Sequence, residues 1–344
     1  MSNHKRHPVV SCSRRAALLP VLALAAHASA EDFNFELALD FERQSLSTAI
    51  PLFGGFPPGS PISTVFEDRD IDTTGLSGTW YFTGANADTG PRSRAAFLSR
   101  ASSLSFTWQR TDVSSSFEIS PPPTLPPAGI AAPAAGTIIG FVPAALPLVT
   151  AIEGDEYAFG GRYVWADSGW FIFGGASFFE GDTGDNVGFS ADTETFVLGT
   201  GLYLGDSTAI EVAVIQTQID RRIGVFNSDD ATDFALSFTH IGDVGASWQY
   251  GVDAALFTRD RSSADTSVSL RGSLYPNRSL AFGLDIETEV DAGFDTGTRY
   301  GVFGSWFITP NIEFEASYGT VDVDTPPGIS SDLDVFSLGL LARF

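Results

Sequence analysis

The last thirteen residues of the chain, 332–344, read DLDVFSLGLLARF, and the rest of the sequence is interpreted from them. Apolar residues occupy every second position of this stretch, at Phe336, Leu338, Leu340, Ala342 and Phe344. Because successive side chains of a β-strand point to opposite faces, these five would share one face. The stretch therefore predicts a strand with one apolar face, closed by a terminal aromatic residue.

The same alternation recurs along the chain. It begins with Phe33, Phe35, Leu37, Leu39 and Phe41, which we assign to one face of a first strand. From Glu156 onward it repeats in segments of about ten to thirteen residues, near the length that a tilted membrane-spanning strand requires. No sustained 3.6-residue apolar pattern is present. The sequence predicts an all-β protein with about 14 strands (12–16).

The predicted connections alternate in length. The short ones are residues 166–169, 205–207, 242–245, 275–278 and 309–311, and the long ones are 181–191, 220–232, 259–264, 291–297 and 321–331. Barrels that span a membrane have short periplasmic turns and longer outer loops. Trp165, Trp170 and Trp306 lie beside short turns, as expected where aromatic rings sit at a membrane interface. These features favour a transmembrane antiparallel β-barrel with both ends of the chain in the periplasm.

The terminal stretch resembles the C-terminal recognition strand of Gram-negative outer-membrane β-barrels, which the insertion machinery of that family reads. The resemblance covers one strand. It implies that Phe344 is an assembly signal, that the protein lies in the cell outer membrane, and that its partners are outer-membrane lipid and the barrel assembly machinery. The alternative is the last core strand of a secreted β-sandwich, but a sandwich has no reason to segregate short and long connections.

Residues 1–30 have the features of a cleaved signal peptide. A basic region containing Arg14 and Arg15 precedes an alanine-rich apolar core, and residues 28–30 read ASA, a small-residue cleavage site. Cys12, the only cysteine, would leave with this segment, so residues 31–344 have no disulfide or thiol chemistry. The formal net charge of −23 argues against nucleic acid as a partner.

Residues 111–155 show no strand pattern and are rich in proline and alanine. Because prolines at this density do not fit a central strand, we expect a long loop on the outer side of the barrel or folded into its mouth.

Catalytic and metal-binding patterns are weak. His240 is the only histidine after the predicted signal peptide, and its parity places it on the lipid-facing side near a short turn. Acidic loop residues such as Asp182, Asp185 and Asp322 do not have the spacing of a calcium loop. We therefore predict a non-enzymatic protein without a metal or other cofactor.

The parity opposite the lipid-facing one carries charge, which at the bilayer midplane would cost about 2–4 kcal/mol per residue if it faced lipid. The residues predicted to line a pore are Glu36, Asp40, Arg162, Glu211, Asp253, Arg271, Asp285, Glu287, Glu289, Arg299, Glu313 and Glu315. Nine of these are acidic and three are basic. The sequence predicts a porin-like channel for passive diffusion of small hydrophilic solutes and ions, with a preference for cations. The alternative is a structural or adhesive barrel with a closed lumen and partner-binding loops. The oligomeric state is not predicted.

Overall fold

The computed structural model describes residues 32–53, 61–88, 90–120, 151–165, 167–182, 190–223, 225–245, 247–260, 264–290, 297–323 and 330–344. The predicted signal peptide, residues 1–30, lies outside the described residues. So do residues 121–150, which make up most of the predicted long loop.

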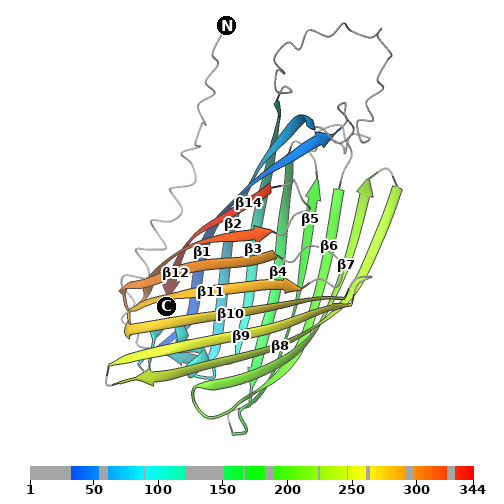
Figure 1. The fold of residues 1–344 in the computed structure, drawn as a ribbon. Coiled ribbons are helices and arrows are strands. Elements are labelled where there is room, and N and C mark those ends of the chain that lie inside the picture. Colours follow the sequence, from blue (N-terminus) through cyan, green and yellow to red (C-terminus); the bar gives the residue numbers. More distant parts are fainter. Residues whose placement is uncertain are drawn as a thin grey trace, which may run out of the picture.

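Fourteen antiparallel strands form one closed barrel, as the sequence predicts. Each strand pairs with its neighbours in the sequence, and β1 pairs with β14 to close the ring (Figure 1). The strands are β1 Asp32–Phe53, β2 Pro61–Asn86, β3 Ser103–Ser120, β4 Ala151–Val164, β5 Trp170–Asp182, β6 Ser190–Tyr203, β7 Thr208–Ile223, β8 Val225–Val244, β9 Trp248–Asp260, β10 Ala264–Asn277, β11 Leu280–Val290, β12 Gly297–Thr309, β13 Ile312–Val323 and β14 Ser330–Arg343.

The outer wall of the barrel is apolar. Large apolar side chains alternate along the strands and remain exposed, for example Leu198 at 70%, Leu284 at 62% and Phe159 at 56%. A closed barrel satisfies its backbone hydrogen bonds between strands, so this surface can face lipid. Period-two alternation thus determines both the strands and the side of the wall that contacts the membrane.

The connections between strands lie alternately at the two ends of the barrel. We call the end that holds Asp32 and Phe344 the turn end, and the opposite end the loop end. At the turn end, β10 and β11 are joined by residues 278–279 and β12 and β13 by residues 310–311. One connection at this end is longer: residues 87–102, between β2 and β3, contain the short helices η2 (Arg92–Arg94) and α2 (Ala95–Leu98).

Several strand boundaries differ from the sequence prediction. The predicted loop at residues 111–155 is partly wrong, because β3 continues to Ser120 and β4 begins at Ala151. The predicted long connection at residues 220–232 is also wrong, since β7 and β8 stay paired up to Ile223 and Val225. These strand ends are rich in Ser, Thr and Asp, so they form backbone ladders without the apolar face that marks the rest of each strand.

Phe33 does not share the face of the other apolar residues of β1. The register between β1 and β2 shifts between Phe33 and Phe35, so that Phe33 pairs with Ala85 and Phe35 with Trp80. Phe33 is 1% exposed, and its ring packs edge-on against Tyr81. A β-bulge of this kind redirects a side chain, and the alternating sequence pattern gives no sign of it.

Among the described residues, no helix is long and apolar enough to cross a membrane.

Candidate functional site

The inner wall carries ion pairs between strands that are not neighbours. Arg162 on β4 lies 2.5 Å from Glu211 on β7, with β5 and β6 between them. Arg271 on β10 lies 3.2 Å from Glu315 on β13, with β11 and β12 between them. Side chains can meet across two intervening strands only on the concave face of the wall, so these four lie in the lumen.

A third pair lies at the seam between β1 and β14. Arg343 donates from Nε to Glu36 at 2.8 Å, and the hydroxyl of Tyr81 donates to the other oxygen of Glu36 at 2.6 Å. The Arg343 guanidinium also lies over the rings of Phe33 and Phe307, at 4.4 and 4.7 Å. The sequence analysis missed Arg343, although its parity on the terminal strand is the inward one.

Asp253 on β9 pairs with Arg94, a residue outside the barrel wall. Arg94 also donates to the Tyr275 hydroxyl at 3.1 Å, and Thr239 donates to Asp253 at 3.0 Å. Burial lowers the pKa of Arg94, but Tyr275 and Asp253 raise it by more, so it lies above its ordinary value. Sequence reasoning could not find Arg94, because it belongs to no strand pattern.

The remaining predicted pore residues lie on the β11–β14 side and on β1. Arg299 and Asp285 are 4.0 Å apart, at the limit of an ion pair. Asp40, Glu287 and Glu313 form no arginine ion pair among the described residues, and neither does Glu42, which the sequence analysis did not include. Glu289 lies on β11 opposite Ser267 in the register, and its side chain is outside the described part of the chain. Carboxylates therefore exceed arginines on this wall.

The connection between β2 and β3 folds into the mouth of the barrel at the turn end. We call residues 90–102 the luminal segment. Ala95 and Ala101 are buried against Phe33 and Tyr81 of the inner wall, and Phe97 packs on Tyr203. The segment therefore lies inside the ring of strands.

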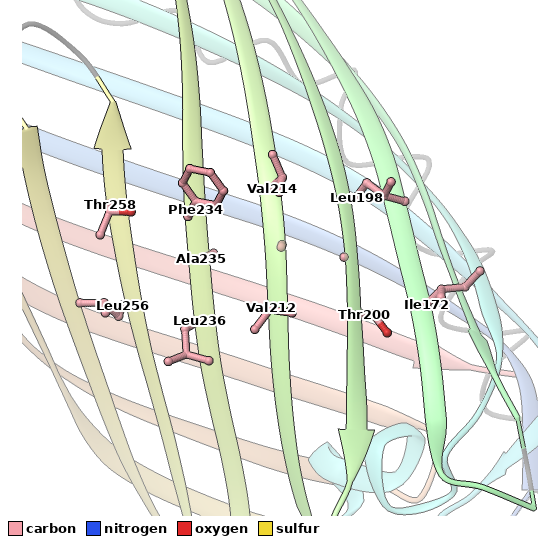
Figure 2. Close-up of a pocket in the computed structure, with 12 residues that line it drawn as sticks. Ile172, Leu198, Thr200, Val212, Val214, Phe234, Ala235, Leu236, Leu256 and Thr258 are labelled. Carbon is pink, nitrogen blue, oxygen red and sulfur yellow. The ribbon is translucent and has the colours of Figure 1, made fainter.

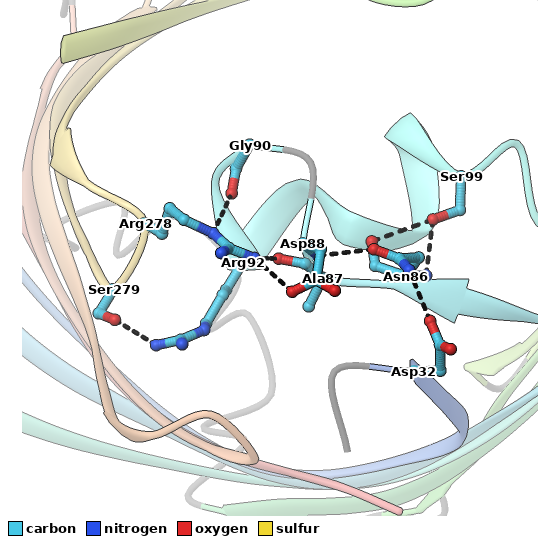
Figure 3. Close-up of polar contacts among 9 residues, drawn as sticks. All are labelled: Asp32, Asn86, Ala87, Asp88, Gly90, Arg92, Ser99, Arg278 and Ser279. Carbon is cyan, nitrogen blue, oxygen red and sulfur yellow. Dashed lines mark hydrogen bonds and ion pairs between the residues drawn. The ribbon is translucent and has the colours of Figure 1, made fainter. Parts of the chain in front are cut away.

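Arginines hold the luminal segment, and residues 87–88 that precede it, to the far side of the mouth (Figure 3). Arg278, in the β10–β11 turn, donates to the backbone oxygens of Ala87 and Gly90 and pairs with Asp88. Arg92 donates to Ser279 and, through its backbone N–H, to the Arg278 carbonyl at 3.0 Å. In a ring of fourteen strands, β9 and β10 stand seven positions from β2 and β3. The segment thus crosses the full width of the turn-end mouth.

Two adjoining cavities lie beside this segment. The larger, about 550 Å³, is lined by Ser93 and Arg94 of the luminal segment and by residues of β8–β14. The smaller, about 310 Å³, lies along β10–β14 and includes Glu42 and Glu287. Both are lined by Ser269, Arg271, Phe303 and Glu315, so they adjoin along the inner wall.

A third hollow, about 670 Å³, lies on the outer wall (Figure 2). Outward-facing residues of β5–β9, among them Ile172, Leu198 and Phe234, form its sides, and no charged residue lines it. Its position on the lipid-facing surface suits acyl chains, and it is separate from the polar lumen.

His240 does not have the environment of a catalytic base. Its Nδ1 lies 2.8 Å from the Thr208 hydroxyl and its Nε2 lies 3.2 Å from the Tyr250 hydroxyl. Its ring stacks on that of Phe238, an exposed residue of the outer wall. Among the described residues, no group of His, Cys, Asp and Glu has a metal-binding arrangement.

No protein-family model matches the sequence, and no curated protein matches it. Solved structures match along almost its whole length. A deltaS2 mutant of the TodX monoaromatic hydrocarbon channel is 9% identical, with a TM-score of 0.50, over 93% of this chain and 92% of that one. A Pseudomonas aeruginosa FadL homologue is 8% identical, with a TM-score of 0.50, over 90% of each chain. The Acinetobacter baumannii outer membrane protein Omp33 is 17% identical, with a TM-score of 0.49, over 91% of this chain and 99% of that one. At these identities the likeness concerns the fold: the chain is a closed 14-strand barrel of the outer-membrane type, and its apolar outer wall places it in the outer membrane.

Proposed function

We propose that the protein is a non-enzymatic outer-membrane channel that lets small hydrophilic solutes diffuse passively and favours cations. The observation that carries this proposal is the contrast between its two surfaces. The outer wall is apolar, whereas the inner wall carries charged and hydroxyl side chains around adjoining cavities. A polar inner wall of this kind suits a water-filled path.

The cation preference rests on carboxylates that no arginine neutralises. Asp40, Glu42 and Glu287 have no arginine ion pair among the described residues. Glu313 is not counted with them, because it is 7% exposed. One unit charge about 7 Å from an ion acts on it with about 0.6 kcal/mol in water, which changes its local concentration about threefold. These carboxylates should therefore attract cations and repel anions along β1 and β11.

The test is the reversal potential across a planar bilayer with a tenfold KCl gradient. We expect the wild-type protein to prefer K⁺ over Cl⁻. Changing Glu42→Gln and Glu287→Gln together should lower the permeability ratio about threefold or more, because both side chains line the smaller cavity.

The matched control is Glu180→Gln with Glu194→Gln. It removes the same charge from exposed residues on the outward parity of β5 and β6 near the loop end. This control should leave the ratio unchanged. Chloride preference in the wild type, or equal ratios for the two double variants, would contradict the proposal.

A structural or adhesive barrel with a closed lumen is the second candidate, and one observation favours it. The luminal segment crosses the turn-end mouth and is held on both sides. A barrel without measurable conductance would support this candidate.

The assembly-signal role of Phe344 remains a proposal. Its backbone N–H donates to the Phe35 carbonyl at 2.9 Å, and its own carbonyl accepts from Asn34 and Phe35. Its ring lies 6.1 Å from that of Phe35, so it takes part in the β1–β14 seam.

A further inference from the structure

The larger luminal cavity has the size and the enclosure of a small-molecule site. Its volume of about 550 Å³ lies within the range of about 300–1,000 Å³ typical of such sites. The luminal segment forms one side of it through Ser93 and Arg94, and the barrel wall forms the other. The cavity therefore lies between the luminal segment and the β8–β14 side of the wall.

Hydroxyl groups dominate the polar lining of the cavity. They belong to Ser93, Ser237, Thr239, Ser269, Ser273, Tyr275 and Ser305. Three are already engaged: Thr239 with Asp253, Tyr275 with Arg94 and Ser305 with Glu313. Among the described residues, the side chains of Ser93, Ser237, Ser269 and Ser273 make no hydrogen bond. Each can both donate and accept one, as the hydroxyls of a solute also can.

The arginines of the cavity are already matched by carboxylates. Arg94 is paired with Asp253, and Arg271 with Glu315. Arg271 also lies with its guanidinium 3.6 Å from the centre of the Phe303 ring, which holds its plane in place. An anionic solute would have to displace a carboxylate from one of these arginines and would also face Glu313. An uncharged solute can hydrogen-bond to the unengaged hydroxyls and to the accessible atoms of the ion pairs without breaking either pair.

We propose that this cavity is a binding site for an uncharged solute that carries several hydroxyl groups, of the size of a mono- or disaccharide. The site would select such solutes beside the luminal segment during their passage. This inference deepens the proposed function and rests on it for the passage, whereas binding itself does not require a conducting channel.

The experiment measures binding and current separately on the full-length protein. Isothermal titration calorimetry of the detergent-solubilised barrel would use glucose and sucrose as uncharged probes, gluconate as the anionic probe and glucosamine as the cationic one. Sugar-induced reduction of the current in planar bilayers would then be measured with the same probes. We expect glucose or sucrose to bind at least tenfold more tightly than gluconate.

The informative variant is Ser237→Ala, Ser269→Ala and Ser273→Ala together. It removes three unengaged hydroxyls from β8 and β10 and should weaken sugar binding at least tenfold. The matched control is Ser105→Ala, Ser177→Ala and Thr195→Ala, which removes three hydroxyls of the inward parity from β3, β5 and β6, outside the cavity lining. It should bind sugar as the wild type does, and both variants should keep the heat-modifiable barrel.

Each outcome bears on the proposal. Sugar binding that the cavity variant loses and the control keeps supports the site, whether or not the barrel conducts. Absence of conductance with such binding would overturn the channel and leave the site. Tighter binding of gluconate or glucosamine than of sugar, equal weakening in the two variants, or no sugar binding to a folded barrel would overturn the site.

Discussion

At the scale of single residues, the seam between β1 and β14 depends on a buried charge. The Arg343 side chain is 3% exposed and that of Glu36 is 14% exposed. Two aromatic rings and the Glu36 carboxylate surround the guanidinium. Since a buried ion pair is costly to break on one side only, these residues make a sensitive point in the closure of the barrel.

Arg343→Met should destabilise the folded barrel by about 3–5 kcal/mol, because it leaves the Glu36 carboxylate buried without its cation. The measurement is equilibrium unfolding by urea in lipid or detergent, followed by loss of the heat-modifiable band. The double change Glu36→Gln with Arg343→Met should recover part of this loss, since it removes both charges.

Arg43→Met provides the control for the seam. Arg43 pairs with Asp70 at 2.8 Å, but both side chains are nearly half exposed. Exposed pairs contribute about 0–1 kcal/mol, so this change should have little effect. If Arg343→Met were as mild as Arg43→Met, the seam pair would not be the stabilising contact that its burial suggests.

The parity of the sequence predicts which charged residues face inward, but it does not predict which arginine each of them pairs with. Glu36, Glu211 and Glu315 were all expected to face inward, and each meets an arginine across the wall or the seam. Which arginine each one meets depends on the register and the curvature of the barrel, and these are not encoded in the spacing of one strand. Arg94 lies in a helical turn and has no parity to read.

At the scale of elements, the luminal segment is held by contacts that a few substitutions can remove. Arg278 alone contacts Ala87, Asp88 and Gly90. Hydrogen bonds to a charged group contribute about 1.5–3 kcal/mol, so Arg278→Ala should raise the population of the detached segment by about 10–100-fold.

The measurement for Arg278→Ala is hydrogen exchange of the Arg92 and Arg94 amides, which bond to the carbonyls of Arg278 and Pro91. Both amides should exchange faster, and the single-channel current should rise and become noisier. Arg110→Ala is the control. Arg110 pairs with Glu153 on β4, and its side chain points outward, whereas that of the neighbouring Gln109 on β3 points into the lumen. Unchanged exchange in Arg278→Ala would show that other contacts suffice to hold the segment.

The strands themselves were predictable in number and type, but their ends were not. Alternation of apolar residues marks the part of each strand that faces lipid, and this gave the correct total of 14. Beyond the lipid-facing part the selection for an apolar face ends, while backbone pairing continues, as in β2 and β3 between Thr111↔Thr73 and Ser120↔Thr64. The bulge at Phe33 and the inward path of residues 90–102 depend on long-range packing, which no local pattern reveals.

At the scale of the whole molecule, the barrel inverts the arrangement of a water-soluble protein. Apolar side chains face out, while the ion pairs and cavities lie within the ring. One alternating pattern determines both faces of each strand. If the apolar residues face lipid, the charged residues between them face the lumen. The luminal segment, which crosses the turn-end mouth, does not belong to the alternating pattern.

The ion selectivity of the whole lumen should depend on the salt concentration. The unpaired carboxylates lie on several strands, so they act on an ion through their summed field and not through one contact. The Debye length is about 30 Å at 0.01 M salt, about 8 Å at 0.15 M and about 3 Å at 1 M. Alternate residues on one face of a strand, such as Asp40 and Glu42, are separated by about 7 Å. Their fields overlap at low and physiological salt and are separately screened at 1 M. The K⁺ over Cl⁻ permeability ratio should therefore be largest near 0.01 M and approach that of free solution at 1 M, as measured from reversal potentials at a fixed tenfold gradient.

The Glu42→Gln, Glu287→Gln variant should show a flatter dependence, and the outward pair Glu180→Gln, Glu194→Gln should follow the wild type. A ratio that is high and independent of salt would instead indicate a tight ion-binding site in the lumen, and the summed field would not be the cause of selectivity.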